Sequence, residues 1–285
     1  MGNQLFTYAA ARRLALVNDA ELVLDDVSGF ARDYKHRRSY QLDHFNIPCR
    51  KATAAERLQP FPRLRRRILL ALGRLRPFEQ RKYIRQETVD FDTRLLQVRP
   101  RGVVYLEGYW QGEGYFKDAE KTIRADLQIR PPSDPVNLAV AAHIQGTVAV
   151  AVHVRFFDAP AESAAGNNAS TDYYHRAVAL MEQHVPDAHY FVFSDNPEAA
   201  RAVIPLADER VTCVMNNAGD DHAYADLWLM TLCQHFIIAN STFSWWGAWL
   251  CANERKRVFA PGFEKRHGMS SWGFKGLLPD GWARC

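Results

Sequence analysis

A turn between an apolar segment and a tryptophan-rich segment concentrates hydrogen-bond donors in this 285-residue chain. The apolar residues 235–239 predict a buried strand, and a helix with three tryptophans in five positions is predicted after it. Asn240, Ser241, Thr242 and Ser244 fill the turn between them. At a helix start the free backbone N–H groups and these side chains would donate towards one point, which suits an anion. A buried helix with several capping residues is the alternative, and these residues leave both open.

His153 and Arg155 stand two positions apart where a strand predicted over residues 148–154 ends. Side chains two apart share one face of a strand, so both would face the same side while Val154 points into the sheet. An arginine at a strand terminus suits a phosphate, because its guanidinium stays charged and offers paired donors. The spacing by itself favours a simpler interpretation, an ion pair between Arg155 and Asp158 that shapes the loop.

Two more polar residues stand at predicted helix starts. Asp226 begins the helical stretch 226–233, where the helix dipole alone would explain an acid. Its functional interpretation is acceptance of N–H donors from a guanine edge. Asn3 precedes an apolar helix predicted from residue 4 to about residue 17, so a helix cap is the local explanation. Its functional interpretation is a second helix start that faces an anion from across a cleft.

The positive charge of the chain is concentrated in one stretch. The formal net charge is +4, yet residues 63–85 carry nine Lys or Arg and one acid, which leaves 27 basic and 31 acidic residues elsewhere. Residues 63–76 mix basic and apolar side chains at roughly helical spacing. This pattern fits a helix on an anionic membrane surface, a nucleic-acid patch or an ordinary solvated helix. Nucleic acid is disfavoured, because the rest of the chain is acidic and carries no nucleic-acid-binding motif.

Cysteine usage and hydropathy indicate a cytoplasmic protein. The cysteines have no paired or CxxC spacing, which fits a reducing compartment and no structural zinc; they are Cys49, Cys213, Cys233, Cys251 and Cys285. No apolar run reaches the roughly 18 residues of a membrane span. We therefore expect a cytoplasmic chain, and the sequence leaves open whether it also contacts the inner face of an anionic membrane.

Strands and helices alternate after the proline-rich residues 130–135, which predict a domain boundary between residues 1–135 and 136–285. The first domain holds the helix from residue 4 and strands over residues 21–25 and 102–106. In the second domain, apolar strands between helices predict a parallel sheet covered on both faces. The predicted strands are 148–154, 190–193, 211–215, 236–239 and 257–259, and the predicted helices are 171–184, 197–203, 221–233 and 243–251. Ligands are expected beyond the carboxyl ends of the strands, where Arg155, Asp158, Ser194, Asp195 and residues 240–244 lie.

Several blocks, taken in order, resemble the bacterial α-1,2-fucosyltransferases of glycosyltransferase family 11. The chain is similar, more distantly, to the α-1,6- and protein O-fucosyltransferases. The resemblance covers nearly the whole chain except residues 50–85, and the stretch 226–250 is its most specific part. Its blocks are Gly2-Asn-Gln-Leu-Phe6, Gly108-Tyr-Trp-Gln111 with Tyr115-Phe116, His153-x-Arg155-x-x-Asp158, Phe193-Ser-Asp195, Asp226-Leu-Trp-Leu-Met230 through Trp249, and Leu278-Pro-Asp-Gly-Trp282.

The resemblance implies a GT-B α/β fold, with two Rossmann-like halves and a donor site mainly in the C-terminal half. It implies transfer of L-fucose from GDP-fucose, with inversion and without metal or cofactor. The acceptor would be a hydroxyl, first the 2-OH of a galactoside, on an oligosaccharide or lipid-linked glycan that is a surface glycan precursor. No nucleic acid partner is implied.

The resemblance also implies roles for individual residues. Arg155 would hold the β-phosphate and act in catalysis, with His153 beside it. Asp226 would read the guanine, and Asn3 would lie across the cleft near the reacting centre as a second catalytic residue. The diphosphate would lie in a cradle formed by Asn240, Ser241, Thr242, Phe243 and Ser244.

The chain departs from the family pattern in two places. Phe156 and Phe157 stand where the family has a second arginine and a glycine. A strand and a glycine pair are expected before Gly2, so the first strand is expected to be missing from residues 1–135, which also carry the basic insertion at about 50–85. These departures suggest the alternative of a catalytically inactive, transferase-like protein that binds a nucleotide or glycan.

Overall fold

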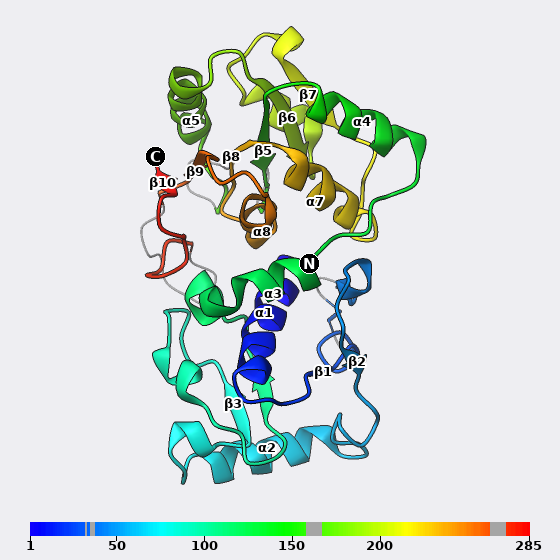
Figure 1. The fold of residues 1–285 in the computed structure, drawn as a ribbon, viewed down its shortest axis with the longest axis vertical. Helices are drawn as coiled ribbons and strands as arrows, with labels where there is room; N and C mark the ends of the chain where they lie inside the picture. The colour runs from blue at the N-terminus through cyan, green and yellow to red at the C-terminus, as the bar shows by residue number, and fades with distance from the viewer. Residues whose placement is uncertain (32, 35–37, 158–166, 263–271) are drawn as a thin grey trace.

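The computed structural model describes residues 1–31, 33–34, 38–157, 167–262 and 272–285. Two α/β halves lie one above the other along the long axis of the molecule (Figure 1). Asp158, the partner that the sequence suggested for Arg155, lies outside the described residues. The loop that the His153–Asp158 block was expected to form is therefore described only as far as Phe157.

The C-terminal half contains a parallel sheet of six strands in the order β10-β9-β8-β5-β6-β7. The predicted parallel sheet is confirmed, and each of its five predicted strands is found within a few residues. The two-residue β10 is too short to give a sequence pattern. The strands are β5 Ala149–Val154, β6 His189–Ser194, β7 Val211–Val214, β8 His235–Ile237, β9 Val258–Ala260 and β10 Ala283–Arg284.

Helices cover both faces of this sheet, as the sequence predicts. Val150, Val152 and Val154 of β5 pack in one apolar cluster with α5 (Thr171–His184) and α6 (Pro197–Ala202). The alternate residues Ala149 and Ala151 pack on the other face, in a second cluster with α4, α7 and α8. These three helices are α4 Pro135–Gln145, α7 Ala223–Leu232 and α8 Thr242–Leu250. The period of two along β5 thus assigns its odd positions, His153 included, to the face that carries α8.

Helix α4 was not predicted, because the prolines of residues 130–135 were interpreted as stops. Pro135 instead occupies the first turn of α4, where its missing N–H costs nothing. The side chain of Asp134 caps the helix by accepting from the backbone N–H of Asn137 at 2.9 Å. An Asp-Pro pair before an apolar run is therefore a helix start here.

The N-terminal half has its strands in two separate parallel pairs. β1 (Val23–Leu24) pairs with β2 (Arg50–Lys51), and β3 (Tyr83–Arg85) pairs with β4 (Tyr105–Glu107). The predicted strands 21–25 and 102–106 are thus shorter than expected or shifted. The helices are α1 Gly2–Leu16, α2 Pro62–Gly73 and α3 Glu120–Asp126, of which α1 confirms the predicted first helix. Short 3₁₀ turns are η1 Leu42–His44, η2 Phe78–Gln80, η3 Thr93–Gln97, η4 Glu113–Tyr115, η5 Lys117–Ala119 and, in the other half, η7 Asp208–Arg210.

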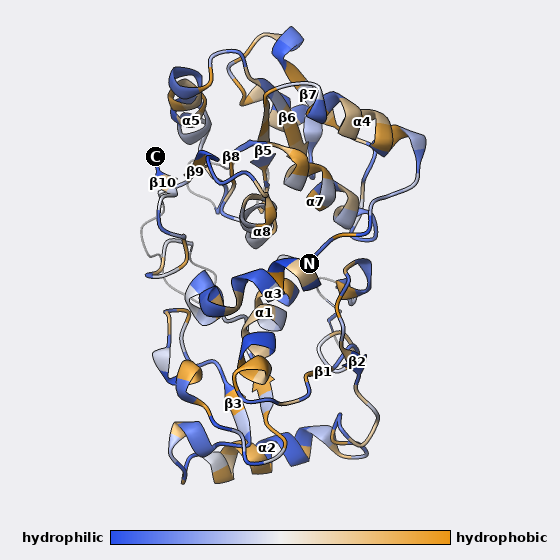
Figure 2. Cartoon of the chain, viewed as in Figure 1, coloured by the Kyte–Doolittle hydropathy of each residue, from blue (hydrophilic) through white to orange (hydrophobic). Residues whose placement is uncertain are grey.

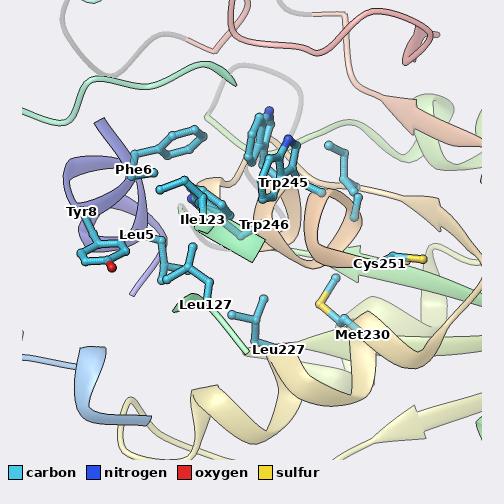
Figure 3. Close-up of a cluster of buried hydrophobic side chains, with 14 of the residues drawn as sticks. Leu5, Phe6, Tyr8, Ile123, Leu127, Leu227, Met230, Trp245, Trp246 and Cys251 are labelled. Atoms are coloured by element: carbon cyan, nitrogen blue, oxygen red, sulfur yellow. The ribbon is translucent and has the colours of Figure 1, made fainter. Parts of the chain in front are cut away.

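One apolar cluster runs through both halves and joins them. The Phe6 ring of α1 lies 4.5 Å from the Trp245 ring and 4.9 Å from the Trp246 ring of α8, measured between centroids (Figure 3). Phe116 stacks on Trp246 at 5.5 Å. The tryptophans of α8 therefore hold the N-terminal half against the sheet half, and the proposed division at residue 135 stays a prediction.

Candidate functional site

The starts of α1 and α8 meet between the two halves. A Cβ atom built on Gly2 would lie 2.5 Å from Thr242 Oγ1 and 2.7 Å from the Phe243 backbone nitrogen, so the two backbones are in contact. Each helix start carries a partial positive charge and unpaired N–H groups. Two such ends repel each other, and an anion between them offsets that repulsion. The structure thus brings together the two helix starts that the sequence could only place separately.

The first turn of α8 uses some of its donors internally. Ser241 is the N-cap, and its hydroxyl oxygen accepts from the Phe243 N–H at 3.3 Å. Ser244 is fully buried, and its hydroxyl donates to the Ser241 carbonyl at 3.3 Å. The capping interpretation therefore explains these two hydroxyls. The backbone N–H of Thr242, which is half-buried, has no intrahelical acceptor, as in any helix start, and stays available for a ligand, whereas Ser244 is fully buried.

Asn240 closes the turn from the strand side. Its side-chain nitrogen donates to the Asn167 carbonyl at 2.6 Å, which ties the turn to the segment before α5. Its side-chain oxygen is buried without a hydrogen-bond partner among the described residues. Burying an acceptor unpaired is costly, so this oxygen is a position where a ligand or a water would be stabilised.

Arg155 projects from the end of β5 with 44% of its side chain exposed. Its Nη1 lies 3.2 Å from Asp195 Oδ2, and Asp195 Oδ1 accepts from the Phe156 N–H at 3.2 Å. The parallel register of Val154 beside Ser194 brings these residues together. The sequence placed Asp195 at a strand end but did not identify it as the partner of Arg155. The available signal was position, because each residue directly follows one of two neighbouring parallel strands. A single half-exposed ion pair is weak, so the guanidinium can also bind an incoming anion.

His153 lies behind Arg155 as a neutral group. Burial, with the nearby Arg155 charge adding to it, lowers the pKa of His153 to about 3. Its ring centroid lies 5.5 Å from the Phe243 ring, and its Nδ1 has no hydrogen-bond partner among the described residues. The imidazole is therefore uncharged at neutral pH and supports the start of α8 by packing.

Further charged side chains surround the start of α1. Burial lowers the pKa of the Met1 amine. The negative charge of Asp220 raises this pKa, and the positive charges of Arg38 and Arg155 lower it further. All three side chains therefore lie near enough to act on the same point, Arg38 from the N-terminal half and the others from the sheet half. Arg38 could not be predicted as a site residue, because no local pattern links it to the other residues.

Asn3 is fixed by the aromatic turn that precedes η4. Gln111 Nε2 donates to Asn3 Oδ1 at 2.9 Å. The Thr7 hydroxyl lies 2.9 Å from the Asn3 carbonyl oxygen and 2.8 Å from the Gly108 carbonyl oxygen. With its oxygen engaged, the Asn3 side chain presents its NH₂ group as the available donor.

Asp226 lies in the first turn of α7 at the end of a hydrogen-bond chain. Asn217 Nδ2 donates to Asp226 Oδ1 at 2.8 Å, and Asn217 and Asn137 exchange side-chain bonds of 2.8 and 2.9 Å. Burial raises the pKa of Asp226 to about 7, although the Asn217 bond opposes the shift. Sequence reasoning missed Asn137 and Asn217, whose contact depends on the packing of α4 against α7. No interaction within the described ranges joins Asp226 directly to Arg155 or to the first turn of α8.

The buried carboxyl group of Asp226 should make stability depend on pH. Its pKa in the folded chain exceeds the ordinary value, so the folded state binds the extra proton and loses stability as pH rises towards 7. In Asp226→Asn the amide oxygen keeps the Asn217 bond without the charge. We expect the variant to gain stability over the wild type by about 1.4 kcal/mol per pH unit between about pH 4 and 7, with no further gain above. Denaturant unfolding at a series of pH values measures this, and a pH-independent difference would contradict it.

The described residues contain no group of three or more His, Cys, Asp or Glu side chains that could hold a metal ion. An Asp-x-Asp spacing occurs at Asp90 and Asp92 in the N-terminal half. Asp92 accepts from the Arg94 backbone N–H at 3.0 Å and pairs with the Arg94 side chain at 2.7 Å. That carboxylate therefore serves as the cap of η3. The expected absence of a metal stays a prediction.

A cavity of about 430 Å³ lies apart from these residues. Its lining combines the end of α3 and the following linker with the C-terminal ends of α7 and α8, among them Arg124, Arg130 and Trp228. None of the predicted site residues lines it, so the chemistry assigned above does not extend into it.

Comparisons with known proteins agree with these features. A family model described as glycosyl transferase family 11 matches residues 61–269. The chain is 27% identical over 262 residues to an α-1,2-colitosyltransferase of Escherichia coli, covering 88% of this chain and 84% of the relative. It is also 27% identical over 280 residues to the E. coli O-antigen biosynthesis glycosyltransferase WbnK, covering 92% and 91%. A crystal structure of the fucosyltransferase NodZ from Bradyrhizobium matches with a TM-score of 0.51, 19% identity and 87% coverage of each chain.

Proposed function

Because the chain belongs to glycosyl transferase family 11 and has the GT-B fold, we propose that it transfers L-fucose from GDP-fucose with inversion. The acceptor in this proposal is a hydroxyl of a surface glycan precursor, first the 2-OH of a galactoside. The observation that carries the proposal is the meeting of the α1 and α8 starts near Arg155, because two helix starts and a guanidinium together form a positive region of the kind that binds a diphosphate.

In this proposal the donor diphosphate lies against the first turn of α8. The Thr242 N–H group and the Arg155 guanidinium donate to it, and Asn240, Phe243 and the buried Ser244 shape the turn around it. Negative charge grows on the β-phosphate as the fucosyl–oxygen bond breaks. Donors already fixed in place stabilise that charge more in the transition state than in the bound donor, which is the source of the acceleration.

Asp226 accepts N–H donors from the guanine edge in this proposal. An ionised carboxylate accepts such bonds better than a protonated one. With its pKa raised to about 7, Asp226 binds guanine at the cost of losing a proton near neutral pH. The Asn217–Asn137 pair then positions the carboxylate.

Asn3 faces the acceptor side in this proposal. Its free NH₂ group, fixed by the Gln111 bond, donates to the reacting centre from the α1 side of the gap. The relative named for O-antigen biosynthesis supports an oligosaccharide or lipid-linked glycan as acceptor. The relative named as a colitosyltransferase makes the donor sugar the first variable to test.

A specific feature supports a second candidate, a catalytically inactive nucleotide or glycan binder. The Arg155 guanidinium lies 5.6 Å from the centre of the exposed Phe157 ring, and Phe157 replaces a family glycine. Release of GDP from GDP-fucose, with and without a panel of galactosides, separates the two candidates. Turnover that a galactoside stimulates supports the transferase, whereas GDP binding without any turnover supports the binder. A colitosyl donor in parallel tests the donor sugar.

The proposed reaction should be insensitive to chelation, because the proposal assigns the diphosphate charge to Arg155 and backbone N–H groups. We expect unchanged turnover in excess EDTA and no stimulation by added Mg²⁺ or Mn²⁺. An assay of GDP release over a titration of each metal measures this. Activity that EDTA removes and either cation restores would instead assign the diphosphate charge to a metal.

The proposal includes a cytoplasmic location with peripheral contact to the inner face of the membrane. Within the part of the chain that the structure describes, no helix is long and apolar enough to span a bilayer. The exposed side chains of the N-terminal half indicate which surface would contact the membrane.

A further inference from the structure

Helix α2 carries an apolar stripe that faces solvent. Phe61, just before the helix, is followed at intervals of three and four residues by Leu64, Ile68, Leu72 and Leu75, and these side chains are between 48% and 84% exposed. This spacing places Leu64, Ile68 and Leu72 along one side of α2, while Phe61 precedes the helix and Leu75 lies in the turn after its end at Gly73. The opposite side contacts the protein, where Gly73 is buried and Arg66 pairs with Asp25 at 3.6 Å. Exposed apolar side chains in a continuous row mark an interaction surface, unlike isolated ones.

Arginines flank the stripe on both sides. At 100° per residue, Arg65 lies on one side of the stripe and Arg67 and Arg74 on the other, with Arg63 farther round towards the packed face, and all four are exposed. Figure 2 shows this mixture of hydrophilic and hydrophobic residues along α2. Long cationic side chains beside an apolar row can keep their charge at a lipid headgroup while their stems contact the acyl region. A protein partner could match the stripe alone, but the double row of cations favours a surface with a high density of negative charge.

A basic cavity lies next to the C-terminal end of α2. It has a volume of about 140 Å³, and five cationic side chains and one acid line it. Arg81 Nε at this cavity is buried without a hydrogen-bond partner in the described part of the chain. The cations are Arg76, Arg81, Lys82, Arg99 and Arg101. The positive surface therefore extends beyond the helix, and it suits phosphate-bearing headgroups.

We propose that α2 docks the protein on an anionic lipid bilayer by inserting this stripe, the five residues Phe61, Leu64, Ile68, Leu72 and Leu75, at the headgroup boundary. Apolar contact holds the helix in the surface, and the flanking arginines select anionic lipid. In Figure 1, α2 lies at the lower end of the molecule, the end farthest from the six-stranded sheet. Docking through α2 therefore leaves the meeting point of the α1 and α8 starts uncovered. The proposal does not depend on the transferase activity.

Removal of the stripe tests insertion directly. The double variant Ile68→Glu/Leu72→Glu should lose binding to mixed phosphatidylcholine–phosphatidylglycerol vesicles in co-sedimentation. Val136→Glu/Leu138→Glu on α4 replaces two equally exposed apolar residues in the other half and should bind like the wild type. Equal thermal melting of both variants shows that the fold is kept. GDP binding and GDP release without lipid should be unchanged in both variants, so failure of docking and failure of the proposed function give different results.

Charge removal tests lipid selection. Arg63→Gln/Arg67→Gln/Arg74→Gln should weaken binding to the same vesicles by about 100-fold, at about fivefold for each charge. Arg255→Gln/Arg257→Gln/Arg284→Gln removes three exposed arginines from the other half and should have little effect. Raising salt should weaken wild-type binding without abolishing it, because apolar contact is not screened. In a Leu72→Trp variant, lipids with brominated acyl chains should quench the tryptophan fluorescence more strongly than they do in the wild type.

Three results would overturn the proposal. The first is a wild type that does not sediment with anionic vesicles, and the second is a stripe variant that sediments as well as the wild type. The third is a wild type that is dimeric and does not bind vesicles, together with a stripe variant that is monomeric. That result would assign the stripe to contact with a second copy of the chain.

Discussion

Arg155→Ala is expected to slow GDP release from GDP-fucose by more than about 100-fold, or about 3 kcal/mol of transition-state stabilisation. The guanidinium stands at the strand end beside the starts of α1 and α8, where charge develops on the leaving diphosphate in the proposed reaction. The loss should appear mainly in kcat, because the interaction strengthens as the bond breaks. Steady-state kinetics with the donor in excess measure it, and equal melting temperatures show that the fold is intact.

Two further variants separate the phosphate role of Arg155 from its ion pair with Asp195. Arg155→Lys keeps the charge and should recover little activity, because an ammonium group cannot reproduce the paired donors of the guanidinium. Asp195→Asn removes the ion-pair charge and should cost less than Arg155→Ala, since an exposed pair contributes about 0–1 kcal/mol. Near-normal turnover by a folded Arg155→Ala protein would remove this residue from the proposed mechanism.

Gly2→Ala is expected to destabilise the protein by about 1–3 kcal/mol and to slow turnover at least about tenfold. The new Cβ atom would lie 2.5 Å from Thr242 Oγ1, 2.6 Å from the Thr242 carbonyl carbon and 2.7 Å from the Phe243 nitrogen. Two of these are backbone atoms of the first turn of α8, so no side-chain rotation relieves the contact. The helix starts must move apart, which displaces the donors proposed to hold the diphosphate.

Gly29→Ala is the matched control, because a Cβ atom at Gly29 would meet no atom within 4 Å. It should melt and turn over like the wild type. Thermal unfolding and donor turnover, measured for both variants, separate a general effect of replacing glycine from the contact at Gly2. If Gly2→Ala matches Gly29→Ala in both measurements, the close approach of α1 and α8 does not set the geometry of the site.

Local sequence patterns predicted most of the sheet half, with α4 and β10 as the exceptions. Short apolar strands separated by helices predict a parallel sheet with both faces covered, because each strand buries side chains on both sides. The helix predicted over residues 171–184 coincides with α5, whose start is fixed by the cap that Ser170 provides to the Tyr173 N–H. Polar residues after successive strands were also expected at one edge of the sheet, because the carboxyl ends of parallel strands share an edge, and Arg155 and Asp195 do meet there.

Only the tertiary structure decided which of these polar residues meet. Arg155 pairs with Asp195, because the register of β5 and β6 sets the two strand ends side by side. The raised pKa of Asp226 depends on burial, and its contact with Asn217 depends on a chain of bonds that reaches α4. Gly2 and Thr242 are remote in sequence, and only the packing of Phe6 on the tryptophans of α8 brings their helices together.

Helix α2 shows the same division between sequence and fold. The sequence by itself determined that residues 63–76 are basic and apolar at helical spacing. It did not determine whether Leu64, Ile68 and Leu72 pack inwards, because a helix can turn its apolar side towards either the protein or its surroundings. The contacts of Arg66 and Gly73 with the rest of the N-terminal half fix the rotation of α2 about its axis. The apolar stripe therefore faces outwards because the opposite side of the helix is the one that packs.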